Sequence, residues 1–136
     1  MYKTILVPVA LDHTGRSEVA VDIARTMLDE GGQITLLHVI EPLPGFADQY
    51  LPADAVDKRI DEAKTDLKTM AKTVGGSTRA VVTRGQPGTM ILEQADTDNS
   101  DCIVIASHRP GLQDYFLGST AARVVRHAPC SVHVIR

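Results

Sequence analysis

The chain has 136 residues, the usual length of one domain, and we expect a single domain over residues 1–136. Its formal net charge is −3 at pH 7, which argues against a general nucleic-acid-binding protein because such proteins usually present a basic face. No apolar run approaches the roughly 20 residues that a membrane-spanning helix needs. The sequence shows no signal peptide, so we expect no membrane span and a cytoplasmic location. Cys102 and Cys130 lie in or beside apolar runs and are interpreted as buried free thiols, with a disulfide as the less favoured alternative.

Strands and helices are expected to alternate along the whole chain. Residues 4–9 form a continuous apolar run, typical of a strand buried on both faces, and Pro8 should mark its end. Residues 17–28 repeat apolar side chains every four positions, which predicts a helix that a Gly-Gly pair at 31–32 ends. The later elements are a strand over 33–40, an irregular excursion over 41–52, a helix over 54–74 capped by Asp54, a strand over 78–83, a short helix from Pro87 to Ala95, a strand over 101–106, a helix over 118–127 ended by Pro129, and a strand over 131–135.

This alternation predicts an α/β fold with an open parallel sheet, right-handed crossovers and helices on both faces. Ligands of such sheets bind beyond the carboxyl ends of the strands, where the strand order reverses. If the strands 4–9 and 101–106 are neighbours, the binding crevice lies between their ends. The final strand, 131–135, is apolar and is expected either at a sheet edge, where it favours pairing with a second copy, or in the sheet interior.

The segment from Ile103 to Thr120 reads as strand, loop and helix start. Its apolar run stops at Ala106 and Ser107, and Gly118-Ser119-Thr120 opens the helix. A helix start offers unpaired N–H groups and a positive dipole end, and hydroxyls add donors, so the pattern favours a phosphate group. A plain N-cap on a core helix explains the same residues, and both interpretations stay open.

Other nucleotide and catalytic motifs are absent. A P-loop and a Gly-x-Gly-x-x-Gly fingerprint are both missing, so NAD is not expected. Arg109 has the fork geometry that suits a phosphate, whereas His108 is better interpreted as a loop residue facing water. Ser107 lacks the elbow motif of a hydrolase triad. No histidine spacing predicts a metal held by side chains alone, which leaves Mg²⁺ bridging nucleotide phosphates as the open alternative.

Several segments resemble universal stress proteins, in the order in which that family carries them. They are Met1–Val9, Leu36–Ile40, Ile105–Pro110, Leu117–Ser119 and Val124–Val132, and the resemblance covers the whole chain. The Ala106–Pro110 form looks most like the small F/G-type members of bacteria. The resemblance implies a Rossmann-like fold of the adenine nucleotide alpha hydrolase type, a five-stranded parallel sheet in the order 3-2-1-4-5, and a homodimer or tetramer.

The resemblance also implies an ATP site. Carried over, Pro8 and Val9 flank the adenine with Val39 beside it; Ala106, Ser107, His108 and Arg109 line the ribose and phosphates; and Gly118, Ser119 and Thr120 cap the phosphates. Two departures stand out: Ala106 replaces the first glycine of the family's Gly-x-x-Gly in a shortened loop, and Ala10 replaces the aspartate that contacts the nucleoside. Asp12, two residues further on, is the candidate substitute, and Gly85 is expected near the same site.

The main hypothesis is therefore an ATP-binding stress-response protein that acts as a nucleotide-dependent switch, with Mg²⁺ on the phosphates and slow hydrolysis at most. The alternative is an interaction module that binds no nucleotide and acts through its dimer surface, and Ala10 and Ala106 favour it. A slow nucleotide hydrolase is the third candidate.

Overall fold

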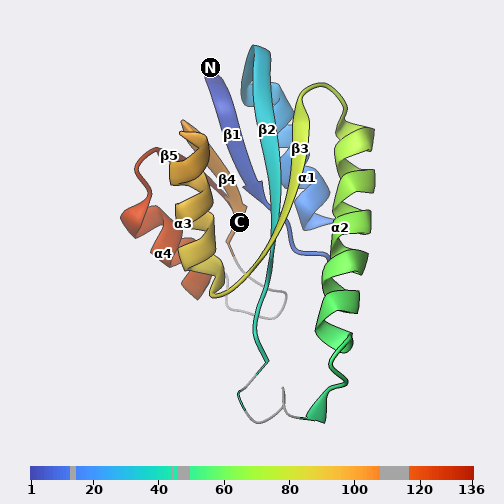
Figure 1. Ribbon diagram of the computed structural model, residues 1–136. Helices are drawn as coiled ribbons and strands as arrows, with labels where there is room; N and C mark the ends of the chain where they lie inside the picture. Colours follow the sequence, from blue (N-terminus) through green and yellow to red (C-terminus); the bar gives the residue numbers. More distant parts are fainter. Residues whose placement is uncertain (13–14, 44, 46–49, 108–116) are drawn as a thin grey trace.

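The computed structural model describes residues 1–12, 15–43, 45, 50–107 and 117–136. Strands and helices alternate along these residues, as the sequence predicts (Figure 1). The elements are β1 (Tyr2–Pro8), α1 (Arg16–Met27), β2 (Leu28–Ile40), α2 (Ala55–Val74), β3 (Thr78–Arg84), α3 (Pro87–Asp98), β4 (Cys102–Ala106), α4 (Ser119–His127) and β5 (Ser131–Ile135). The five strands form one parallel sheet in the order β3-β2-β1-β4-β5, which confirms the expected fold and places β5 at an edge.

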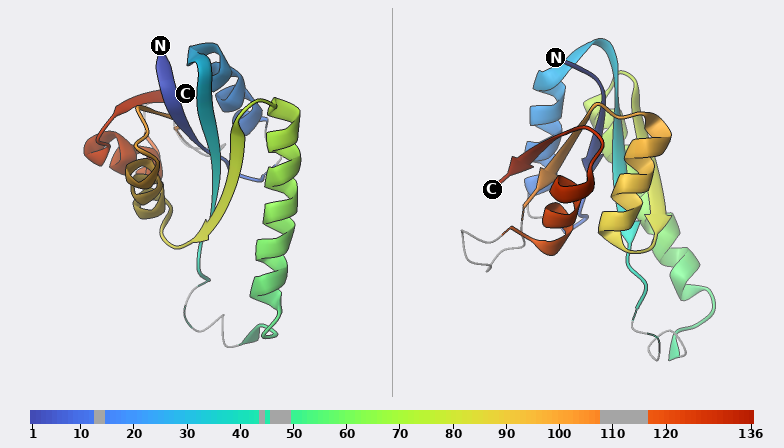
Figure 2. Two further views of the ribbon diagram at one scale, coloured as in Figure 1. Left: turned by 45° about the horizontal axis from the view of Figure 1, so that its top comes forward. Right: turned by 90° about the vertical axis from the view of Figure 1, so that its left-hand side faces the viewer.

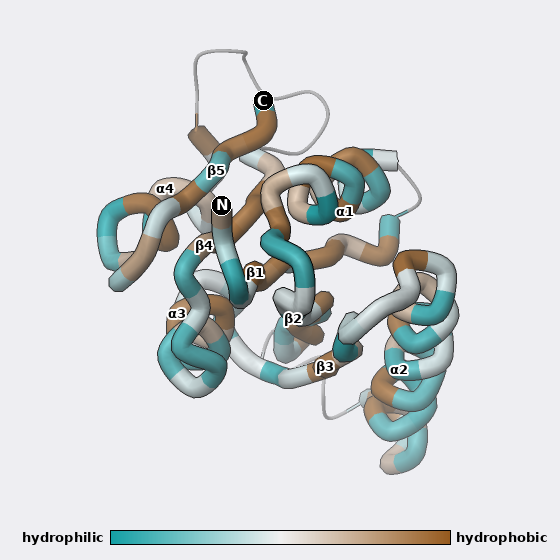
Figure 3. Tube along the Cα trace, turned by 90° about the horizontal axis from the view of Figure 1, so that it is seen from above, coloured by the Kyte–Doolittle hydropathy of each residue, from teal (hydrophilic) through white to brown (hydrophobic). Residues whose placement is uncertain are grey.

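Helices cover both faces of the sheet, α1 and α2 on one and α3 and α4 on the other (Figure 3). The central strand β1 supplies both cores: Ile5 and Val7 face α1 and α2, and Leu6 faces α3 and α4. All three side chains are fully buried, which confirms the two-sided burial that the continuous apolar run predicts. These buried aliphatic side chains hold the helices against the sheet, and the sheet in turn positions the ends of its strands.

The prediction that Gly31-Gly32 ends the first helix is wrong. Helix α1 ends at Met27, and β2 begins at once with Leu28, five residues earlier than the apolar run indicates. Tyr2 pairs with Leu28 while Thr4 pairs with Gln33, so β2 carries extra residues opposite the start of β1. Gly31, at φ +78°, supplies the left-handed conformation that this irregularity requires.

One other expected boundary differs, and the expected cap of α2 lacks its side-chain hydrogen bond. Asp54 precedes α2 with helical backbone angles and makes no side-chain cap hydrogen bond. Helix α3 continues beyond Ala95 to Asp98, where Asn99 in the left-handed conformation ends it. The Asp98 carboxylate accepts a hydrogen bond from Gln94 at 3.0 Å and pairs with Arg79 at 3.5 Å, which stabilises this last turn. Of the predicted excursion over 41–52, residues 44 and 46–49 lie outside the described residues.

Candidate functional site

The sheet opens between β1 and β4 at the carboxyl ends of the strands. These neighbours pair only at Ile5–Cys102 and Leu6–Ile103, whereas β1 stays paired with β2 as far as Pro8–Leu37. The strand order reverses at this point, because β1 leads to β2 on one side and β4 leads to β5 on the other. The structure therefore has the strand-order reversal at which the fold class binds ligands, between the two strands that the sequence predicts as neighbours.

Side chains from two neighbouring elements hold the main chain that follows β1. The Val9 amide donates to the Leu37 carbonyl at 2.7 Å, and Nδ1 of His38 lies 2.7 Å from the Val9 carbonyl oxygen. At the next residue, the Ser17 hydroxyl accepts from the Ala10 amide at 3.2 Å and donates to the Ala10 carbonyl at 3.0 Å. The main chain that follows β1 is thus held by His38 and Ser17 without any side-chain polar group at position 10.

The end of β4 is joined directly to the start of α4. Ser107 is buried, its amide donates to the Ile135 carbonyl at 2.8 Å, and its own carbonyl accepts from the Gly118 amide at 2.6 Å. Gly118 makes no side-chain cap hydrogen bond, and the Ala122 amide donates to its carbonyl at 2.8 Å. The first N–H groups of α4 precede this hydrogen bond and have no intrahelical acceptor. Residues 108–116 of the loop lie outside the described residues, and with them the predicted His108 and Arg109.

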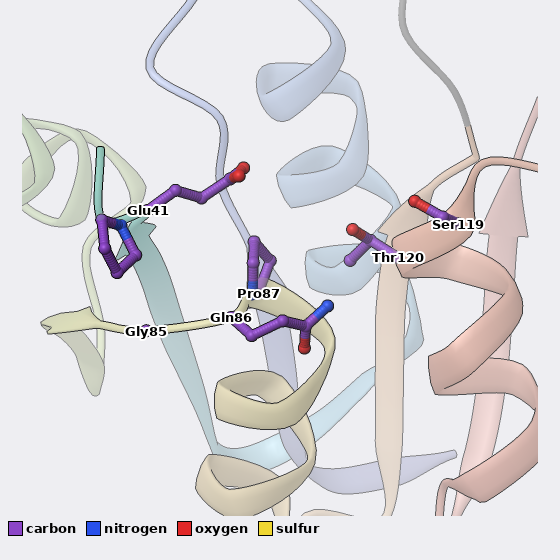
Figure 4. A pocket seen from close by; sticks show the side chains of 7 residues that line it. Glu41, Gly85, Gln86, Pro87, Ser119 and Thr120 are labelled. Carbon is purple, nitrogen blue, oxygen red and sulfur yellow. The ribbon is translucent and has the colours of Figure 1, made fainter. Parts of the chain in front are cut away.

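A pocket of about 340 Å³ lies between the start of α4 and the ends of β2 and β3, and its size is within the usual range of small-molecule sites (Figure 4). Its lining residues are Glu41, Pro42, Gly85, Gln86, Pro87, Ser119 and Thr120. The starts of α3 and α4 lie side by side at this end of the sheet (Figure 2). Both helices therefore direct the positive ends of their dipoles towards the same region.

Gln86 is held in one orientation at the edge of this pocket. As the N-cap of α3, its side-chain Oε1 accepts a hydrogen bond from the Thr89 amide at 2.6 Å. An N–H donor requires the oxygen as its acceptor, so the amide nitrogen Nε2 is on the other side, towards the pocket (Figure 4). The pocket consequently receives a fixed donor from Gln86 in addition to the hydroxyls of Ser119 and Thr120.

The structure brings only part of the predicted site together in this pocket. Ser119 and Thr120 line it, and Gly118 precedes them as the N-cap. None of the other predicted residues that the structure describes lines the pocket. Pro8 ends β1 and Val9 follows it, Asp12 is exposed, and Val39 lies in β2 opposite Thr83. Ala106 ends β4, and Ser107 follows it. Gly85, expected nearby, does line the pocket.

Sequence reasoning missed Glu41 and Gln86. Each lies just beyond the carboxyl end of a strand: Glu41 follows β2 directly, and Gln86 is two residues after β3. The same position after a strand identified Ser107, which follows β4. Glu41 extends from the end of β2 into the pocket, above Pro87 in the view of Figure 4. It is the only carboxylate among the described residues that line the pocket.

Cys102 and Cys130 are free thiols, as predicted, but only Cys102 is buried and Cys130 is half-buried. Cys102 begins β4 and Cys130 precedes β5, so both lie outside the pocket. Burial is the main cause that raises the pKa of Cys102 to about 11, and the charges of Cys130 and Asp101 raise it further. Burial also raises the pKa of Cys130. Within the described ranges, no group of three or more His, Cys, Asp or Glu side chains is arranged to hold a metal ion, and no helix is both long and apolar enough to span a membrane.

The family model named "Universal stress protein family" matches residues 1–136. The chain belongs to the universal stress protein family. It is 34% identical to Universal stress protein G of Salmonella typhimurium and 36% identical to that of Escherichia coli O157:H7, with 100% of both chains covered in each comparison. Among solved structures, the universal stress protein UspA from Lactobacillus plantarum superposes with a TM-score of 0.76 at 27% identity, over 99% of this chain and 98% of that one.

Two solved family members with the same fold carry adenine nucleotides. One is a universal stress protein in complex with cAMP, at 21% identity and a TM-score of 0.69, covering 99% of this chain and 97% of that one. The other is the universal stress protein from Archaeoglobus fulgidus in complex with dAMP, at 20% identity and a TM-score of 0.64, covering 99% and 98%. At these identities the likeness to this chain is one of fold.

Proposed function

We propose that this universal stress protein binds an adenine nucleotide, ATP with Mg²⁺ in the first instance, and acts as a nucleotide-dependent switch. The observation that carries the proposal is the pocket at the start of α4, which is lined by Ser119, Thr120 and Gln86. Donors at a helix start are suited to phosphate oxygens. The complexes of two family members with cAMP and dAMP support the same ligand class.

In this proposal the phosphates lie at Gly118, Ser119 and Thr120, and the nucleoside lies towards the crevice between β1 and β4. Pro8, Val9 and Val39 flank the adenine, and Ala106 and Ser107 border the ribose, with Asp12 beside them and His108 and Arg109 in the loop. The hydroxyl and carboxylate oxygens of the pocket are ligand types that Mg²⁺ accepts together with phosphates and water. The described part of the pocket has no lysine or arginine that would stabilise charge in a phosphoryl transfer, so hydrolysis is expected to be slow.

Switching requires that the nucleotide bind one conformation or assembly better than another. The edge strand β5 provides a surface on which assembly could change, because its outer side has no strand partner in the described sheet. We propose a homodimer or tetramer that forms through this edge in the cytoplasm. An interaction module without nucleotide is the second candidate, and it is favoured by Ala10, whose side chain offers no polar group and whose main-chain groups already bind Ser17.

Calorimetric titration with ATP and Mg²⁺ tests the proposal. The double variant Ser119→Ala/Thr120→Val removes both hydroxyls from the pocket, and Ser77→Ala, at an exposed serine between α2 and β3, is the matched control. We expect micromolar binding by the wild type and by the control, and a loss of at least tenfold in the double variant. Absence of binding by folded wild-type protein would favour the interaction module.

A further inference from the structure

Buried polar side chains gather where α3 ends, at the opposite end of the sheet from the pocket. Four buried side-chain oxygens lack a hydrogen-bond partner among the described residues, and three of them belong to Thr35, Asp98 and Ser100. An unpaired buried polar group costs folding free energy, and a charged one costs more, so such groups in native proteins are almost always satisfied. The positions of these three oxygens indicate that they share one partner.

Asp98 uses only one of its two carboxylate oxygens within the described protein. Its side chain is 4% exposed, and Oδ1 accepts from Gln94 at 3.0 Å and pairs with Arg79 at 3.5 Å. Oδ2 is buried and has no partner among the same residues. An ionised carboxylate only accepts hydrogen bonds, so the partner that Oδ2 needs is a donor.

Thr35 places a hydroxyl group beside the same ion pair. It lies in β2 two residues before Leu37, which packs in the core under α3 and α4, so the Thr35 side chain is on that face too. Its register neighbour in β3 is Arg79, the ion-pair partner of Asp98. Thr35 is 1% exposed, and its Oγ1 has no partner in the described part of the chain. Thr35 and Asp98 therefore both flank Arg79, one from the sheet and the other from the helix.

Ser100 borders this region from the turn that follows α3. Its amide donates to the Ala95 carbonyl at 2.9 Å, and the next amide, that of Asp101, donates to the Thr4 carbonyl at 2.9 Å. These two hydrogen bonds hold the turn between the end of α3 and the start of β1. Ser100 is buried, and within the described ranges its Oγ is unpaired.

We propose that a buried water molecule lies between the end of α3 and β2, where it donates to Asp98 Oδ2 and hydrogen-bonds the hydroxyl groups of Thr35 and Ser100. A buried water typically makes about three hydrogen bonds, which is the number that these groups provide. The Arg79 guanidinium disfavours a metal cation in the same place because it repels positive charge, and the Asp98 carboxylate disfavours an anion. The ligand is thus a small neutral molecule that both donates and accepts, and it joins the helix to the sheet.

The variant Thr35→Val tests this site because it keeps the shape of the side chain and removes the hydroxyl group. A hydroxyl that bonds the water leaves it short of a partner when removed, whereas an orphaned hydroxyl is replaced by a methyl group without loss. Thr83→Val is the matched control, at the fourth unpaired oxygen, because Thr83 lies near the carboxyl end of β3 and far along the sheet from Asp98. Thermal unfolding gives the Tm of each protein, and a high-resolution crystal structure of the wild type locates the water.

We expect Thr35→Val to lower Tm by about 3–5 °C and Thr83→Val to leave it unchanged or raise it. In the crystal structure we expect a water within hydrogen-bond distance of Asp98 Oδ2 and of Thr35 Oγ1. An unchanged or raised Tm in Thr35→Val would overturn the inference, as would a wild-type crystal structure without a water at these two oxygens. Neither result bears on nucleotide binding, because the residues concerned lie outside the pocket.

Discussion

The carbonyl oxygen of Ser107 accepts a hydrogen bond from the amide of Gly118 at 2.6 Å, across ten intervening residues of sequence. This bond fixes the start of α4 against the end of β4, and Ser107 is in turn tied to the end of β5 through Ile135. The helix start that lines the pocket is thus positioned by the sheet itself. The geometry of the pocket depends on that connection.

Replacing Gly118 by proline tests the connection. At φ −58° the site suits proline, which removes the N–H that binds Ser107. We expect the free energy of unfolding to fall by about 1–2 kcal/mol and nucleotide binding to weaken, as measured by denaturant unfolding and calorimetry. Gly118→Ala keeps the N–H and should behave like the wild type. Equal losses in the alanine and proline variants would show that the hydrogen bond is not the cause.

Replacing His38 tests the hydrogen bond that holds the main chain after β1. His38→Ala leaves the Val9 carbonyl without the side chain that binds it, so we expect nucleotide affinity to fall several-fold. His38→Asn retains a donor near the position of Nδ1 and should recover most of the affinity. The measurement is calorimetric titration of both variants with ATP. If the asparagine variant loses as much affinity as the alanine variant, the bond to Val9 does not position the site.

A substitution at the opposite end of the sheet should lower stability without changing nucleotide binding. The Asp101 carboxylate accepts from the Lys3 and Thr4 amides at 2.9 and 3.0 Å and holds the start of β1 against β4. Asp101→Ala should lower the free energy of unfolding by about 1–3 kcal/mol, because two main-chain donors lose a charged acceptor. The exposed Asp96 provides the control variant Asp96→Ala. Nucleotide affinity, measured below the unfolding temperature, should stay at the wild-type value, and a loss there would contradict the separation of the two ends.

The raised pKa of the Cys102 thiol predicts that stability depends on pH. Its pKa is raised from 9.0 to about 11 in the folded protein, so the unfolded chain loses the thiol proton first as the pH rises. The stabilisation is fully present below pH 9 and is lost between about pH 9 and pH 11. In thermal unfolding across this range, wild-type Tm should fall more steeply than the Tm of Cys102→Ala. Parallel curves for the two proteins would contradict the raised pKa.

The sequence is sufficient to predict the sheet, because burial on both faces of β1 leaves a continuous apolar run from Ile5 to Val7. It misplaces the start of β2, since Gly31-Gly32 resembles a helix stop when the pairing of Tyr2 with Leu28 is unknown. The candidate site, too, is predictable only where a local pattern in the sequence marks its residues. Ser119 and Thr120 are recognisable from their own segment, which opens a helix after a buried strand.

Glu41 and Gln86 become neighbours of that helix start only through the packing of α3 against α4. Gly88 illustrates the closeness of this packing, because a Cβ atom there would lie 2.6 Å from Cδ of Arg123. No local pattern in the sequence joins residues that are more than thirty positions apart. The lining of the pocket is therefore a property of the tertiary structure.

The most direct test of nucleotide binding at the start of α4 is a ¹H–¹⁵N NMR titration of the wild-type protein with ATP and Mg²⁺. We expect the largest amide shifts at Ser119, Thr120 and Ala121, with a second set at Val9 and Val39. Shifts confined to other surfaces, such as α2 or β5, or no shifts at millimolar ATP, would contradict this expectation.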